Sequence, residues 1–312
     1  PVEINLDTKF SNLDLDIISN IIPNWFHLGG LISGDMNIFG NTEKTRFDFD
    51  VNIKEAVFDK IKFGFVKGRG NYDGQTLDFS QYSSEWKQNF LEGHASLPLD
   101  YNIGSNQFGR AILEKPIFLS IGGRTNDLRF ISSYLAGLDS IIGNFKIQLG
   151  LSGDWNNLIR DGLIDIVNAN IFTDRLKNPI TNVDGRGQLL SNRLTFENLN
   201  GIMNKPLENQ KEKNVFITGS MDMTNFFEPY FDIWLIGENI YFEAIQEELK
   251  GMINLDVTMK GKDDITISGK IPIVDVEMFK DFTSFSLPGS FSKDGRVSLN
   301  YKINFPITEQ FT

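Results

Sequence analysis

Residues 30–58 read GLISGDMNIFGNTEKTRFDFDVNIKEAVF. The stretch begins with a segment bracketed by Gly30 and Gly40, and continues with a run in which apolar residues take every second position from Phe47 to Ile53. Alternation of apolar and polar residues over this length indicates a β-strand with one dry face and one solvated face. The stretch therefore predicts β-strands that each have a single apolar side.

The same arrangement occurs three times along the chain. Two glycines ten residues apart recur, and a phenylalanine follows the second glycine by 18 or 19 positions in every copy. The later copies are Gly143, Gly153 and Phe172, and Gly251, Gly261 and Phe279, which correspond to Gly30, Gly40 and Phe58. An internal repeat with a period of about 110 residues predicts an architecture built unit by unit.

The repeat sets the expected boundaries. We expect repeat unit 1 at residues 1–125, unit 2 at 126–238 and a partial unit 3 at 239–312, in one continuous array cut from a longer chain. A second landmark supports the first two units, because GRGNYDGQTLDF at 68–79 and GRGQLLSNRLTF at 185–196 share their spacing. Residues 71–74 have the composition of a hairpin turn.

The charge and composition of the chain exclude several classes of partner and site. The formal net charge is −11, which argues against nucleic acid and against anionic membrane surfaces as partners, because both need clustered Lys and Arg. The chain has no cysteine, so disulfides and thiolate metal sites are excluded. No apolar run approaches the ~18 residues that span a bilayer as a helix.

A sheet of one-sided strands must cover its apolar face or curl around something apolar. Strands of about nine residues extend about 30 Å, which is long for a sandwich of this size. We therefore predict a mainly β fold: an elongated, curved, U-shaped or taco-like sheet of about three repeats, with short helical turns and an apolar groove.

The order of elements resembles that of a known family. A Leu-x-Leu segment at Leu13 and Leu15 precedes an expected short helix, then Gly30, an alternating strand, Gly40 and a second alternating strand. This pattern resembles the AsmA-like proteins, and within that family the TamB type, over nearly the whole chain. The resemblance implies a periplasmic groove that conducts phospholipid between the inner and outer membranes of a diderm bacterium. It also implies that the parent protein is anchored in the inner membrane and contacts an Omp85-type outer-membrane barrel.

A groove for lipid needs a continuous apolar lining. Moving two acyl chains of about 30 methylenes into water costs on the order of 25 kcal/mol. We expect the inward rows of the strands to supply the lining collectively, with acyl chains on the dry face and head groups near the open rim. The expected lining residues are Phe47, Phe49, Val51, Ile53, Phe63, Phe65, Phe145, Ile147, Leu149, Leu255, Val257, Met259, Val297, Leu299, Tyr301 and Ile303.

The sequence gives little indication of a metal-binding or catalytic site. The run Asp48, Asp50 and Asn52 has the first three ligand spacings of a calcium loop, but Ile53 stands where that loop needs glycine, so a solvated strand face explains it better. No nucleophile, base or metal constellation is recognisable, which predicts a non-enzymatic protein without cofactor or metal. The two histidines, His27 and His94, are isolated from any such motif.

Three alternatives use the same pattern differently. A structural or adhesive β-repeat protein would seal the apolar rows in a packed core, and an open trough would distinguish the conduit from it. A transmembrane barrel would place the apolar row outside with aromatic girdles, whose spacing is not evident here. A carbohydrate-binding protein would expose Trp and Tyr platforms, whereas most aromatic residues here are Phe on the expected inward rows.

Overall fold

The computed structural model describes residues 1–18, 28–58, 61–86, 89–128, 138–174, 176–204, 212–225, 229–243, 249–262, 264–278 and 298–304. These residues form 18 strands and one helix of four residues, α1 (Leu15–Ile18). The strands pair as an antiparallel sheet that is not closed into a barrel. The predicted mainly β class is confirmed, whereas the predicted curved groove stays a prediction.

The chain divides into two compact units, which are described separately. Unit 1 contains residues 1–125 and 146–162, and unit 2 contains residues 126–145 and 163–312. Two strands, β9 (Leu138–Gly153) and β10 (Leu158–Thr173), are divided between the units, and the last two residues of β8 (Ile117–Asp127) also belong to unit 2. None of the helices in the described part of the chain has the length and hydrophobicity needed to cross a membrane.

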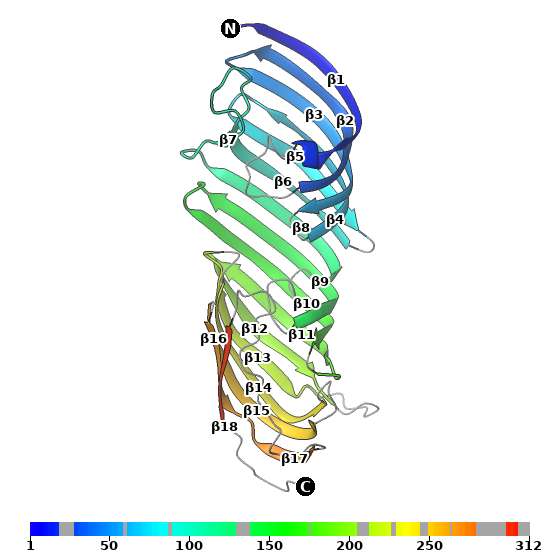
Figure 1. Ribbon diagram of the computed structural model, residues 1–312, viewed down its shortest axis with the longest axis vertical. Coiled ribbons are helices and arrows are strands. Elements are labelled where there is room, and N and C mark those ends of the chain that lie inside the picture. The colour runs from blue at the N-terminus through cyan, green and yellow to red at the C-terminus, as the bar shows by residue number, and fades with distance from the viewer. Residues whose placement is uncertain are drawn as a thin grey trace. The chain divides into compact units, whose positions relative to one another are not determined.

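Unit 1 is an antiparallel meander in which each strand pairs with the next (Figure 1). The short strand β7 lies beside β6, and β6 also pairs with β8. The strands are β1 (Glu3–Asp14), β2 (Leu28–Asn41), β3 (Thr45–Phe58), β4 (Ile61–Tyr72), β5 (Thr76–Trp86), β6 (Asn89–Asp100), β7 (Arg110–Ala111) and β8 (Ile117–Asp127).

Unit 2 repeats this meander from β11 to β16. Strand β15 pairs with both β16 and β17, and β18 runs parallel to β16. The strands are β11 (Ile180–Leu190), β12 (Arg193–Ile202), β13 (Val215–Asp222), β14 (Tyr230–Glu243), β15 (Leu249–Gly261), β16 (Asp264–Lys270), β17 (Ile273–Met278) and β18 (Ser298–Asn304).

The second glycine of each repeated pair has an equivalent structural place. Gly40, Gly153 and Gly261 stand at the ends of strands with φ of 102°, 101° and 136°. A Cβ atom at any of them would lie 2.1–2.5 Å from a carbonyl oxygen three or four residues later. Only glycine adopts this conformation in the space available, so the repeated spacing records where each long strand turns back.

Bulges interrupt the long strands. Asn12, Glu55, Asn198 and Asn239 all have positive φ and sit where the strand register shifts. A bulge bends its strand and increases the local twist. The strands β1 to β3 are visibly arched in Figure 1.

Candidate functional site

The apolar side of unit 1 is centred on β3. Phe47, Phe49, Val51 and Ile53 project from one side of this strand and alternate with exposed acidic or polar residues. Residues directly opposite each other on antiparallel strands share a face of the sheet. Phe49 pairs with Met36 of β2, so the same side continues onto the neighbouring strand. We call this side of each unit the apolar face.

Glycines on the neighbouring strands make room for large side chains of the apolar face. Val51 stands in register between Gly34 of β2 and Gly68 of β4. A Cβ atom at Gly70 would lie 2.7 Å from Cζ of Phe49, so this ring occupies the space above the glycine. Lateral packing of this kind explains how Phe49 is only 8% exposed within a single sheet.

One end of the apolar face in unit 1 is covered by residues 100–109, which we call the strap. The aromatic ring of Tyr72 stacks on Phe47 at 5.0 Å between centroids and meets Tyr101 of the strap at 5.8 Å. The backbone N–H of Tyr101 donates a hydrogen bond of 2.8 Å to the Tyr72 hydroxyl. Burial raises the pKa of Tyr72 to about 12, because the phenolate would lose its hydration.

Asn102 fastens the strap to two hairpin turns. Its Oδ1 accepts a hydrogen bond from the backbone N–H of Thr45, and its Nδ2 donates to the carbonyl of Gly74. Thr45 begins β3 directly after the turn from β2, and Gly74 lies in the turn between β4 and β5. Elsewhere in unit 1 the described residues include no second sheet, and the one described helix has four residues.

The apolar face of unit 2 is formed in the same way. Leu255, Val257 and Met259 alternate along β15, and their register partners on β14 are Gly237, Leu235 and Ile233. Val257 also pairs with Gly269 of β16. Val257 is buried, whereas Leu255 and Met259 are half-buried.

The remaining predicted lining residues are placed to different extents. On β9, Phe145 of unit 2 and Ile147 of unit 1 are buried, and Leu149 of unit 1 is half-buried. The register of β18 pairs Leu299, Tyr301 and Ile303 with Ile265, Ile267 and Gly269 of β16, on the backbone positions that continue the face of Met259. Val297 lies outside the described residues.

The prediction was wrong for Phe65. Its neighbour Val66 pairs with Ile53 of the apolar face, so Phe65 projects from the opposite side, where it is 36% exposed. Nζ of Lys67 lies 5.6 Å from the Phe65 ring centroid. Phe63 sits where the register of β3 and β4 shifts, between the pairs Ala56–Gly64 and Val57–Lys62. The inward positions of β4 are mostly glycines. The alternating phenylalanines therefore led to the wrong prediction of which side of β4 belongs to the apolar face.

Sequence reasoning also missed members of the apolar face. Their positions follow from register with Phe49 and its neighbours, which no single-strand pattern contains. These members are Met36, Tyr72, Phe79, Ala95 and Leu119 in unit 1 and Ile233 and Leu235 in unit 2. The Phe79 ring meets Phe49 edge-on at 5.2 Å.

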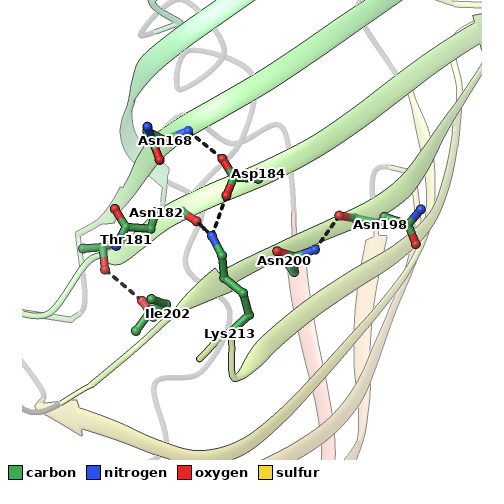
Figure 2. Close-up of polar contacts among 8 residues, drawn as sticks. All are labelled: Asn168, Thr181, Asn182, Asp184, Asn198, Asn200, Ile202 and Lys213. Carbon is green, nitrogen blue, oxygen red and sulfur yellow. Dashed lines mark hydrogen bonds and ion pairs between the residues drawn. The ribbon is translucent and has the colours of Figure 1, made fainter. Parts of the chain in front are cut away.

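A polar cluster holds two bulged strands of unit 2 together (Figure 2). Nζ of Lys213 lies 2.7 Å from Oδ2 of Asp184 and donates to the carbonyl of Asn182. Oδ1 of Asp184 accepts a hydrogen bond of 2.8 Å from the backbone N–H of Asn168. Asn168 and Asn182 have φ of 51° and 50°. The hydrogen bond from Lys213 holds the pKa of Asp184 below its usual range.

Comparison of this chain with protein-family models, with curated proteins and with solved structures found no match. Within the described residues, no group of three or more His, Cys, Asp or Glu is arranged to hold a metal ion. The extended apolar faces, rather than a compact cluster of reactive groups, are therefore the candidate site.

Proposed function

We propose that this chain is part of a periplasmic conduit whose apolar faces hold phospholipid acyl chains as they pass between the inner and outer membranes. The observation that supports this function best is that, apart from the strap and the four-residue helix α1, which packs beside β2, the described residues of unit 1 add no second sheet or longer helix to the single sheet. Phe47 and Ile53 of this face are only half-buried, and apolar surface left in water is costly unless an apolar ligand occupies it.

The chemistry of the face suits acyl chains. Its partly exposed members, among them Phe47, Ile53, Leu255 and Met259, offer carbon surface to a ligand. Phe49 packs above Gly70 of the neighbouring strand and meets Phe79 edge-on, so this part of the face consists of aromatic carbon. Burial of each methylene contributes about 0.8 kcal/mol, so a face several strands wide binds a chain without any specific polar contact.

The location and the partners follow from the resemblance alone. Similarity to AsmA-like proteins of the TamB type supports a periplasmic conduit in a parent protein that is anchored in the inner membrane. The same resemblance supports contact between the parent protein and an Omp85-type barrel. The acidic net charge of −11 would keep the polar outer face in solution while the apolar face holds lipid.

A structural or adhesive β-repeat protein is the second candidate. It is favoured by the low exposure of Phe145 and Val257, at 2% and 9%, because a sealed core buries its side chains to this degree. The two candidates differ in whether the face accepts a ligand.

The test compares two variants that add the same charge to opposite sides of β3. Ile53 belongs to the apolar face and is half-buried, whereas its neighbour Asn52 projects to the other side. We expect the wild-type protein to retain phospholipid in native mass spectrometry, Ile53→Asp to lose most of it, and Asn52→Asp to retain it. Wild-type protein free of lipid, or equal retention by a folded Ile53→Asp variant, would favour the structural alternative.

A further inference from the structure

The outer face of unit 2, opposite its apolar face, exposes two aromatic side chains on one strand. Trp234 and Tyr230 are 44% and 47% exposed on β14. They alternate with Ile233 and Leu235, which belong to the apolar face. Both aromatics therefore project toward solvent, on the face that also carries Ile236 and its register partner Phe216 of β13, which is 43% exposed.

The indole of Trp234 is held in a fixed orientation with an uncovered ring. Its Nε1 donates a hydrogen bond of 2.8 Å to Oδ1 of Asp256. The residues directly beside it are Thr218 on β13 and Thr258 on β15, whose short side chains leave room above the ring. A rigid, half-exposed indole whose polar atom is already satisfied is a ready stacking surface.

A pocket adjoins Trp234 on the same strand. Asn239 has a φ of 47° and forms a bulge opposite Asn254, whose Oδ1 accepts a hydrogen bond of 2.8 Å from the Asn239 backbone N–H. A Cβ atom at Gly237 would lie 2.0 Å from Cδ1 of Ile240, so Ile240 fills the space on the apolar side, whereas Ile236 and Asn254 stand at the positions that alternate with the apolar face. The pocket has a volume of about 270 Å³ and is lined by Ile236, Gly237, Glu238, Asn239, Asn254 and Leu255.

We propose that Trp234 and this pocket form a binding site for a neutral glycan. A pyranose ring stacks its C–H face on an indole, because the aromatic face is electron-rich. Its hydroxyl groups can both donate and accept, which matches the carboxylate of Glu238 and the amide groups of Asn239 and Asn254. Trp234 and Ile236 are two residues apart, which is about 7 Å along the strand. Adjacent sugar units can therefore contact the Trp234 ring and the pocket at the same time.

Charge favours a neutral glycan over other ligands. Asp232, Asp256 and Glu238 all lie on this side of β14 and β15, and only Asp232 has a cationic partner, Lys260 at 3.1 Å, among the ion pairs of this patch in the described residues. Acidic glycans and anionic lipid surfaces would be repelled. Acyl chains would leave the polar groups of the pocket without hydrogen bonds.

The experiment is calorimetric titration of the folded protein with two probes, the β-1,4-linked tetramers of N-acetylglucosamine and of glucose. We expect wild type to bind at least one tetramer, and Trp234→Ala to weaken that binding by about tenfold or more. Glu238→Ala should also weaken tetramer binding, because it removes a polar group of the pocket. The affinity of Trp234→Phe for the tetramer should lie between those of wild type and Trp234→Ala. Phe90→Ala is the control, because Phe90 is 47% exposed in unit 1 and lies far along the chain from this patch.

Failure of wild type to bind either tetramer, or unchanged binding by Trp234→Ala, would overturn the proposal. The proposal would also be overturned if Trp234 were needed for binding phosphatidylglycerol vesicles, or for binding another protein, while neither sugar tetramer bound. The site is on the opposite face from the proposed lipid path, so lipid retention by Trp234→Ala should equal that of wild type. A negative sugar titration therefore leaves the proposed function standing, and loss of the lipid function leaves this site standing.

Discussion

Gly70 lies directly across from Phe49, and a Cβ atom at Gly70 would stand 2.7 Å from Cζ of the ring and 1.9 Å from the carbonyl oxygen of Asp78. The absence of a side chain on one strand thus makes room for the large side chain of its neighbour. The same relationship joins Val51 to Gly68 in register. It lets Phe49 pack closely against the neighbouring strand, where the ring also meets Phe79 edge-on.

Gly70→Ala should therefore destabilise unit 1 by about 1–3 kcal/mol, because the new methyl group overpacks the site against both the Asp78 carbonyl oxygen and the Phe49 ring. Gly122→Ala is the matched control, since its nearest neighbour to a new Cβ atom is the carbonyl oxygen of Ile147 at 3.8 Å. Urea unfolding measures both variants. Equal stability of the two variants would show that the glycine does not make room for the ring.

Tyr72→Phe should change stability in two pH ranges. At neutral pH it leaves the Tyr101 backbone N–H without its acceptor, which costs about 1–3 kcal/mol. Because the folded pKa of Tyr72 is raised to about 12, its contribution is full below the unfolded pKa of about 10 and is lost as pH rises through the folded value. The variant should thus lose less stability than wild type between these pH values. Parallel declines in unfolding free energy would contradict the assignment.

Lys213→Met tests the polar cluster in unit 2. The lowered pKa of Asp184 is caused first by the hydrogen bond from Lys213. A carboxyl group with a depressed folded pKa contributes stability above its unfolded pKa and loses it as pH falls through the folded value. Because both side chains are partly exposed, we expect a loss of no more than about 1 kcal/mol at neutral pH and a smaller loss near pH 2. An equal loss at both pH values would mean that the ion pair contributes nothing.

The strand pattern of this chain was largely predictable, but the side that each strand presents was not. The alternation from Phe47 to Ile53 places β3 correctly, and the expected turn at residues 71–74 falls between β4 and β5. On β4 the same alternation predicted that Phe65 belongs to the apolar face, although the inward positions of this strand include Gly68 and Gly70. Glycine is neither clearly apolar nor clearly polar. The sequence of one strand therefore does not identify an inward side that consists of glycines.

Bulges and distant contacts were the other source of error. Glu55 shifts the register in the middle of β3, so alternation before it does not predict the face after it. The strap depends on hydrogen bonds from Asn102 to residues 28 and 57 positions away, which no local pattern encodes. The exposure of Trp234 likewise follows from the register of β14 with its neighbours, which the sequence of one strand does not contain.

The central claim is that acyl chains occupy the apolar face and not its reverse. The most direct measurement is photocrosslinking in the periplasm of cells, with benzoylphenylalanine in place of Leu255 or, as the control, of Asp256. These neighbours on β15 project from opposite faces of unit 2, as their partners Gly237 and Ile236 do. The account predicts covalent phospholipid adducts, detected by mass spectrometry, at position 255 and few or none at 256. Equal labelling at both positions, or no lipid adduct at 255, would contradict it.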